Sequence, residues 1–459
     1  MKRHIEIAKK FSRKSLKSGL ACLWLMMAFL ASNTAKAQSQ YFTTVANGGT
    51  YSWDGANWSV SGGTSSGPFA SDWVPGDFAR FYGGASDTYT VTVNASESMA
   101  GMYLDSGSAT SLSINDAGNG TGSLSVTPDT VQATQNGFSW LTQGFLTGGG
   151  SLTINAPITG TGGVEEESGG GTLALYGNNS YTGGTLFTSS STFVDYNNNN
   201  SFGAVSSQIG YDGTTFSIMD NTGPSTVNIA NPVQVIGTTG INFIGNSATM
   251  SGSMTLGANT VNLRNNGVGT TETLSGIISG SGTLTFSGAN GGIFALATQN
   301  TFSGTVVIGS SGDTAVTLQL AAPNALSGAS QLTLSGGTLN LGGLSQNMFS
   351  TTLGMTASST IDFTSSASTL LLANSSGQAW TGTLDLVNWN PAVDTLVFGG
   401  GSSGLTAAQL DDIEFNGADL GSAGINANGG VTIVPEPPTV ILGVVGGLAM
   451  MWRLRRRTV

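Results

Sequence analysis

The sequence predicts an all-β protein, built as a right-handed parallel β-helix or solenoid, and three observations support this. Short segments in which apolar and small polar residues alternate recur along most of the 459-residue chain. A period of two buries one face of a strand and exposes the other. Turns rich in glycine, asparagine and serine separate many of the segments, and no convincing helix-length pattern lies between them. The segments are residues 90–94, 111–115, 123–127, 151–155, 172–176, 283–287, 317–320, 331–335, 338–341 and 383–386.

Two all-β architectures fit this pattern, a sandwich or barrel and a parallel solenoid. A sandwich of about 400 residues exceeds the usual size of one domain, and several sandwiches would need linkers, of which none is visible. Stacked coils can extend much further, because each coil buries its apolar side chains against its neighbours. Asparagine and threonine on the coil faces can also hydrogen-bond along a stack with a spacing of about 4.8 Å. We therefore favour the solenoid.

Residues 1–37 have the organisation of a secretory signal peptide. A long basic region precedes an apolar stretch at residues 19–31. The small residues Ala35 and Ala37 then frame a cleavage site, so we expect the mature chain to begin at Gln38 after export by the Sec machinery. The basic region contains Lys2, Arg3, Lys9, Lys10, Arg13, Lys14 and Lys17.

Residues 38–100 are predicted to form an N-terminal capping module, because a stack of coils must cover its open ends. This stretch contains Trp53, Trp58 and Trp73 and resembles the opening module of solenoid repeat proteins. The tryptophans are expected to form the core of the cap. The alternative is a glycan contact, since a flat indole face matches a pyranose ring.

Residues 101–379 are predicted to form the solenoid repeats. The segments GTGGV at 160–164 and GTLALYGNNSYTGGT at 171–185 resemble the autotransporter-associated β-strand repeat. A degenerate copy reads ISGSGTLTFSG at 278–288 and NTFSGT at 300–305, with Phe302 at the position of Tyr181. The resemblance implies coils of a parallel β-helix in a secreted protein.

Residues 380–434 are predicted to form a C-terminal β-rich capping module. Residues 384–390 and 394–399 alternate as strands do. Residues 405–415 show the spacing of a short amphipathic helix with Thr406 as its N-cap. The arrangement resembles the module that commonly precedes a C-terminal sorting signal.

Residues 435–459 have three zones in a fixed order. Pro435, Glu436 and Pro437 precede an apolar run at about 439–452, and a basic tail follows at 453–457. A helix of about 14 residues spans roughly 21 Å, which is less than the ~30 Å hydrocarbon core of a bilayer. Arginines after such a segment hold that end in the cytoplasm. The tail consists of Arg453, Arg455, Arg456 and Arg457, with one leucine between them.

These three zones resemble the PEP-CTERM sorting signal. The resemblance implies recognition by exosortase, a membrane transpeptidase, with a transient inner-membrane anchor and final delivery to the cell surface or the extracellular matrix. It also implies an association with exopolysaccharide.

The composition of the body excludes several classes of function. All but two of the 14 lysines and arginines lie before residue 38 or after residue 434, which leaves Arg80 and Arg264. The single histidine, His4, and the single cysteine, Cys22, lie in the predicted signal peptide. The mature chain therefore has no lysine, histidine or cysteine. This excludes catalysis by histidine, cysteine or lysine, zinc sites built on histidine or cysteine, and disulfides. Nucleic-acid binding is excluded because the body has almost no positive charge with which to neutralise phosphate groups.

Paired carboxylates are all that glycoside hydrolysis requires, and two acidic runs in the sequence could supply them. Residues 165–167 read as a solvated loop, whereas Asp411, Asp412 and Glu414 read as the polar face of the predicted helix. Neither has the spacing of a known calcium motif, although weak Ca²⁺ binding is compatible with their oxygens. We expect no catalytic residue, no metal site and no cofactor.

The sequence thus predicts an exported, non-enzymatic solenoid that serves as adhesin, scaffold or surface component. The first alternative is an exopolysaccharide-binding surface protein, and the remote alternative is a β-helical polysaccharide-degrading enzyme.

Overall fold

The computed structural model of the chain describes residues 38–434 apart from short internal gaps. The gaps are residues 43–47, 60–70, 82–86, 105–110, 128–133, 136–137, 140–141, 147–149, 167–170, 189–192, 214–215, 314 and 418–421. The predicted cleavage residues Ala35 and Ala37, the motif Pro435–Glu436–Pro437, the apolar helix at 439–452 and the tail arginines Arg453, Arg455, Arg456 and Arg457 lie outside the described residues. The chain divides into two compact units, residues 1–39 and 40–459, and the solenoid belongs to the second.

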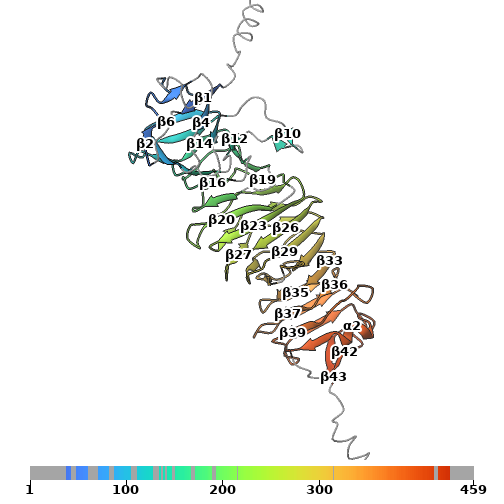
Figure 1. The fold of residues 1–459 in the computed structure, drawn as a ribbon. Helices are drawn as coiled ribbons and strands as arrows, with labels where there is room; N and C mark the ends of the chain where they lie inside the picture. The colour runs from blue at the N-terminus through green and yellow to red at the C-terminus, as the bar shows by residue number, and fades with distance from the viewer. Residues whose placement is uncertain are drawn as a thin grey trace, which may run out of the picture. The chain divides into compact units, whose positions relative to one another are not determined.

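The largest sheet holds 13 strands, which lie side by side in chain order (Figure 1). They are β2 (Thr50–Ser52), β5 (Thr88–Val93), β8 (Ser111–Asp116), β13 (Ser151–Ile154), β16 (Thr172–Leu175), β18 (Phe193–Tyr196), β20 (Phe216–Asn221), β23 (Thr239–Gly245), β26 (Thr260–Asn265), β29 (Thr283–Ser287), β31 (Thr305–Ile308), β33 (Gln331–Ser335) and β36 (Thr352–Ala357).

Two further large sheets run alongside it. The 11-stranded sheet contains, in order, β28 (Ile278–Ser279), β25 (Met254–Thr255), β22 (Val233–Val235), β19 (Ile209–Tyr211), β17 (Thr185–Phe187), β15 (Gly163–Glu166), β12 (Thr142–Leu146), β7 (Gly101–Leu104), β4 (Phe78–Phe81), β1 (Ser39–Phe42) and β3 (Trp58–Ser59). The 9-stranded sheet contains β21 (Asn228–Ile229), β24 (Ala248–Met250), β27 (Thr271–Leu274), β30 (Ile293–Leu296), β32 (Thr317–Leu320), β34 (Thr338–Asn340), β37 (Ser359–Asp362), β39 (Leu384–Val387) and β41 (Ile413–Phe415).

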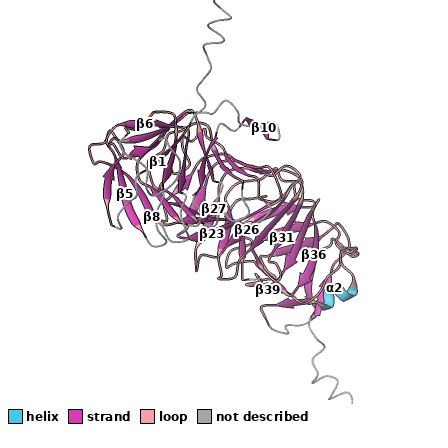
Figure 2. Cartoon of the chain, turned by 45° about the horizontal axis from the view of Figure 1, so that its top comes forward, coloured by secondary structure: helices cyan, strands magenta, loops and turns pink. Residues whose placement is uncertain are grey.

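Short sheets complete the described part, in which strands dominate (Figure 2). One three-stranded sheet holds β14 (Ile158–Gly160), β9 (Ser123–Val126) and β6 (Ser96–Met99), and another holds β35 (Ser345–Met348), β38 (Thr369–Leu372) and β40 (Thr395–Phe398). Two antiparallel pairs are β10 (Thr134–Gln135) with β11 (Phe138–Ser139) and β42 (Ser422–Ile425) with β43 (Val431–Val434).

Successive coils pair in parallel, which confirms the predicted parallel β-solenoid; its right-handed sense stays a prediction. The strands β26, β27 and β28 follow one another in the chain yet belong to three different sheets. One turn of the chain therefore visits three faces before it returns to the first. A coil spans 21 residues where Leu152 pairs with Leu173 and 26 where Val306 pairs with Leu332. Every segment predicted from alternation overlaps a strand.

Apolar side chains of successive coils form buried columns inside the stack. In one column Val261, Leu284, Val306, Leu332 and Leu353 follow one another in register, and none is more than 1 % exposed. Full burial of a side chain of this size stabilises the fold by about 1.5–3 kcal/mol. The continuous core explains why so many short strands form one unit without linkers.

Buried asparagines tie neighbouring coils together at the corners of the repeat. Asn179 Oδ1 accepts a hydrogen bond from the backbone N–H of Ile158 at 2.8 Å, and its Nδ2 donates to the carbonyl of Ser201 at 2.8 Å. Asn300 repeats the pattern, accepting from Ile278 N and donating to Ala325 O. The two segments that look alike in sequence thus occupy equivalent places in their coils.

Glycines occupy corners where coils approach too closely for a side chain. A Cβ atom on Gly304 would overlap the carbonyl oxygen of Gly282, and one on Gly276 would overlap that of Gly252. These glycines are required for close approach of two backbones, because any larger residue would separate the coils.

We expect Gly304→Ala to lower the free energy of unfolding by about 1–3 kcal/mol, because the methyl group must displace the backbone of the preceding coil. Chemical denaturation of the purified protein measures this. The control is Gly377→Ala, where a Cβ meets no atom within 4 Å, and which should leave stability nearly unchanged. Equal effects of the two substitutions would contradict the packing argument.

The parallel ladders stop against antiparallel strands at two of their ends. At the start of the 11-stranded sheet β1 pairs with β3 antiparallel, and Trp58 forms a further antiparallel bridge with Ser71. Near residue 434, β42 and β43 form an antiparallel hairpin. This hairpin adjoins the three-stranded sheet, because Phe398 N at its edge strand β40 donates to Gly429 O at 2.8 Å. Between these ends the ladders continue across residues 100–101 and 379–380, where the predicted modules meet the repeats.

The predicted helix at 405–415 is shorter in the structure. Helix α2 spans Ala407–Asp411, and Thr406 caps it as predicted through a reciprocal pair of hydrogen bonds with Gln409. The chain then forms β41, which pairs in parallel with β39. The prediction of a helix through residue 415 is wrong, because Ile413 and Phe415 alternate and bury their side chains in the last coil.

Candidate functional site

The tryptophans of the N-terminal module lie in its core. Trp53 and Trp58 have no exposed surface and Trp73 is 8 % exposed. Their ring centroids lie between 4.6 and 5.3 Å apart, and the indole N–H of Trp58 donates to the carbonyl of Trp53 at 2.8 Å. The alternative glycan contact does not fit this burial, because no indole face is free to stack on a sugar.

The described residues of the two acidic runs lie on β15, on β41 and at the end of helix α2. Glu165 and Glu166 lie on β15, and Glu166 is fully buried, so the prediction of a solvated loop is wrong for it; Glu167 lies outside the described residues. Asp411 ends helix α2, Asp412 caps it and Glu414 is exposed on β41. Across the described ranges no group of three or more His, Cys, Asp and Glu is placed to hold a metal ion.

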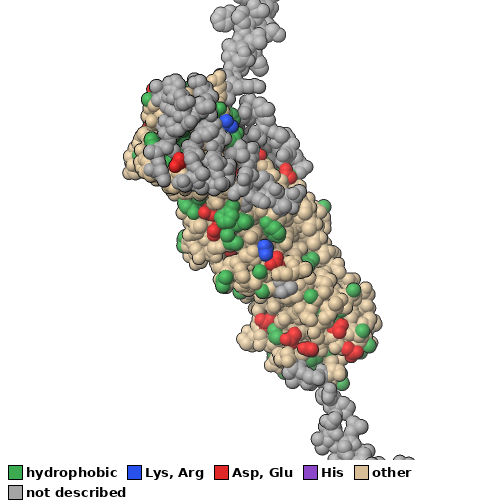
Figure 3. All heavy atoms as spheres, viewed as in Figure 1, with side chains coloured by type: hydrophobic (Ala, Val, Ile, Leu, Met, Phe, Trp, Pro, Cys, Tyr) green, Lys and Arg blue, Asp and Glu red, His purple; other side chains and the backbone are tan. Residues whose placement is uncertain are grey.

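The register of the coils brings together two aspartates that sequence reasoning missed. Asp195 on β18 and Asp220 on β20 are directly paired on the outer face of the largest sheet. Burial, and next the charge of Asp220, raise the pKa of Asp195 to about 6, and burial raises the pKa of Asp220. Figure 3 shows hydrophobic side chains gathered on this stretch of the surface with acidic ones beside them.

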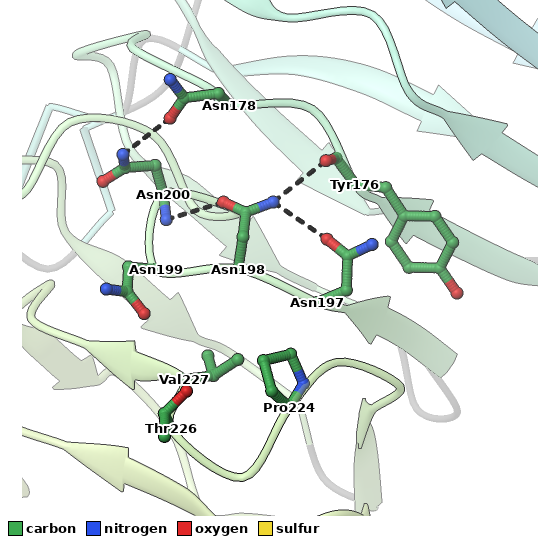
Figure 4. A pocket seen from close by; sticks show the side chains of 9 residues that line it. All are labelled: Tyr176, Asn178, Asn197, Asn198, Asn199, Asn200, Pro224, Thr226 and Val227. Atoms are coloured by element: carbon green, nitrogen blue, oxygen red, sulfur yellow. Dashed lines mark hydrogen bonds between the residues drawn. The ribbon is translucent and has the colours of Figure 1, made fainter.

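A pocket of about 570 Å³ opens beside these aspartates (Figure 4). The loop Asn197–Asn200 lies on one side of it and the loop that carries Pro224, Thr226 and Val227 on the other, with Tyr176 at one end. Asn178 from the preceding coil completes the lining. Three successive coils therefore build the pocket, each through the turn that follows its strand in the largest sheet.

One asparagine of the pocket is structural. Asn198 Nδ2 donates to the backbone carbonyls of Tyr176 and Gly177, at 3.0 and 3.3 Å, and to Asn197 Oδ1 at 2.9 Å. Its Oδ1 accepts from the backbone N–H of Asn200 at 2.9 Å. Asn198 thus fixes the turn that presents its neighbours to the pocket.

Tyr176 is fixed at its hydroxyl end. Thr222 Oγ1 donates to the hydroxyl at 3.0 Å, and the hydroxyl donates to Asp195 Oδ2 at 3.4 Å. Burial raises the pKa of Tyr176, so the phenol stays neutral at physiological pH. The half-buried ring has a defined orientation at the end of the pocket.

An ionisable side chain also lies inside the solenoid. Glu272 on β27 is 1 % exposed, at an inward position of the alternation, and burial raises the pKa of its carboxyl group to about 8. A backbone hydrogen bond from Ala248 opposes this shift, whereas Oε2 has no hydrogen-bond partner among the described residues. Glu272 is not among the residues that line the pocket described above, and its burial bears on stability.

Arg264 has a structural role that its neighbours in sequence do not reveal. Its Nη2 lies 2.7 Å from Asp313 Oδ1, and its guanidinium carbon lies 5.7 Å from the centroid of the Phe216 ring. The pair joins residues 49 positions apart, across more than one coil. This ion pair therefore ties β26 to the chain near Asp313.

The part of the chain that the structure describes contains no helix long and apolar enough to span a membrane.

Comparison of the chain with family models, with curated proteins and with solved structures finds no match.

Proposed function

We propose that this chain is an exported, non-enzymatic β-solenoid protein that acts as a scaffold or adhesin at the cell surface or in the extracellular matrix. The observation that supports this is the unbroken parallel ladder of 13 strands with its buried apolar columns. Such a stack presents a long regular surface of hydroxyl and amide groups, as extended binding and spacing proteins do.

The proposed route depends on the two ends of the chain. The Sec machinery exports the chain and cleavage follows Ala37; the apolar segment then holds the tail in the inner membrane until an exosortase-type transpeptidase acts at Pro435–Glu436–Pro437. A body without lysine suits this destination, because trypsin-like proteases find only Arg80 and Arg264 between residues 38 and 434.

We expect protein released from the surface of expressing cells to begin near Gln38 and to lack residues 450–459. Intact-mass measurement together with sequencing of the tryptic fragment that ends at Arg80 tests both ends at once. Replacing Arg455, Arg456 and Arg457 by Asn should reduce retention of the membrane intermediate, because most of the charge that fixes topology is removed. A released chain whose mass includes residues 450–459 would contradict the sorting proposal.

The scaffold role has its own test. Antibodies against the body should label intact cells, and deletion of the gene should weaken attachment or matrix cohesion. A protein found only inside the cell would exclude both adhesin and scaffold.

A further inference from the structure

The pocket between the loops at 176–178, 197–200 and 224–227 has a lining without a charged side chain. Five of its nine lining residues are asparagines, and the others are Tyr176, Pro224, Thr226 and Val227. Its volume of about 570 Å³ lies within the range of about 300–1,000 Å³ that is typical of small-ligand sites. A lining of amides suits a ligand whose groups both donate and accept hydrogen bonds, as sugar hydroxyls do.

Two of the amides that line the pocket, those of Asn178 and Asn199, are held in place through the oxygen only. Asn178 Oδ1 accepts from Asn200 Nδ2 at 2.7 Å, and Asn199 Oδ1 accepts from the backbone N–H of Asn228 at 2.8 Å. The Nδ2 groups of Asn178 and Asn199 make no hydrogen bond to any described residue. Each side chain is therefore oriented by its oxygen and keeps a free N–H₂ donor, which lowers the entropic cost of binding.

An aromatic ring stands at the end of the same pocket. Tyr176 is held through its hydroxyl by Thr222 and Asp195, so the ring does not have to be ordered when a ligand arrives. Figure 4 shows the Asn197 amide nitrogen on the side that faces this ring. An apolar ring surface beside amide groups matches a pyranose, which has both C–H faces and equatorial hydroxyls.

The charges around the pocket favour a neutral ligand over an acidic one. Asp195 contacts Tyr176 and is paired with Asp220, so the surroundings of the pocket are negative. No lysine or arginine lines the pocket, and Arg264 is engaged by Asp313. A uronate or sulfated glycan would meet carboxylates with no cation to compensate them.

We propose that this pocket binds an uncharged carbohydrate, a short segment of a neutral hexose or pentose polymer. Tyr176 supplies the stacking surface, Asn178 and Asn199 supply donors, and Asn198 positions the turn. The inference goes beyond the scaffold role, which names no ligand, and it does not depend on how the chain is exported.

The test uses the purified full-length chain and calorimetric titration with defined hexasaccharides. The neutral probes are cellohexaose, maltohexaose, mannohexaose and xylohexaose, and the charged probe is hexagalacturonate. We expect at least one neutral probe to bind with a Kd below about 1 mM and hexagalacturonate not to bind. Failure of every neutral probe to bind, or preference for the uronate, would overturn the proposal.

Two substitutions locate the site without disturbing the turn. Asn178→Asp and Asn199→Asp keep an oxygen that accepts the structural hydrogen bond and replace the free N–H₂ donor by a second carboxylate oxygen, which adds a negative charge. Each should weaken binding at least tenfold, and the double variant should abolish it. The matched control is Asn324→Asp, since Asn324 Oδ1 accepts from Asn347 N at the same 2.8 Å outside the pocket, and it should bind as the wild type does.

Hydrogen exchange of the wild-type chain provides a readout that needs no variant. The bound oligosaccharide should slow amide exchange at residues 176–178 and 197–200. Protection confined to another part of the chain, or unchanged affinity in the double variant, would overturn the placement of the site.

Discussion

Glu272→Gln should remove a large pH-dependent loss of stability. The carboxyl group has a pKa of about 8 in the folded chain against an ordinary value of 4.5, because burial disfavours its charged form. The folded state therefore binds a proton that the unfolded state releases between these two values. Wild-type stability is fully present below about pH 4.5, falls as the pH rises, and levels off above about pH 8.

The size of the effect follows from the same pKa values. Each tenfold change in proton affinity corresponds to about 1.4 kcal/mol, so the loss amounts to roughly 5 kcal/mol at pH 9. Glutamine resembles the neutral acid and keeps an oxygen for the Ala248 N–H. The variant should match the wild type near pH 4.5 and exceed it at pH 9.

Denaturant titrations at pH 4.5, 7 and 9 measure this, and the difference between the two proteins isolates Glu272 from the other carboxylates. Glu414→Gln serves as the control, because that side chain is exposed on β41 and its charge stays in water. Parallel curves for wild type and Glu272→Gln would show that the carboxyl group is not buried as described.

Asn179→Ala should destabilise the solenoid by about 2–6 kcal/mol. The substitution leaves the backbone N–H of Ile158 and the carbonyl of Ser201 without the side-chain partner that each has in the wild type. Each buried polar group without a partner costs about 1–3 kcal/mol. The loss should also be local, with faster hydrogen exchange at the amide of Ile158 than at distant coils.

The neighbouring residue provides the control. Asn178 is exposed and accepts one hydrogen bond from Asn200, so Asn178→Ala should cost less than about 1 kcal/mol. If both alanine variants lose the same stability, the buried asparagine does not tie the coils together as proposed.

The strands could be predicted from the sequence because the alternation of apolar and polar residues is a local pattern. The inward position of Glu272 follows from the same pattern, since Leu274 two residues later points inward as well. The sequence alone therefore could have indicated a buried carboxyl group at this position. The predicted helix at 405–415 was too long because two patterns meet in this segment. Helical spacing continues up to Leu410, and strand-like alternation runs from Ile413 to Phe415.

The candidate site was harder to predict because it depends on register. Asp195 and Asp220 are 25 residues apart in sequence, whereas paired positions in the largest sheet lie 21 residues apart at Leu152 and Leu173 and 40 at Leu112 and Leu152, so counting cannot identify neighbours in a column. The run Asn197–Asn200 was visible, but its pocket needs Pro224 and Val227 from a later coil. The tryptophans of the N-terminal module were easier to interpret. They cluster in the sequence, and their predicted place in the core of the module agrees with their burial.

The antiparallel strands at the ends of the ladders bear on how copies of this chain meet one another. A parallel strand edge is a template, and identical molecules could add to it without limit and form a filament. Where the strand direction reverses, the evenly spaced hydrogen bonds of the parallel ladder give way to alternating narrow and wide pairs, so another parallel coil no longer fits. At the β1–β3 end and at the β42–β43 hairpin the chain therefore offers an arriving copy no parallel edge that would continue its own coils.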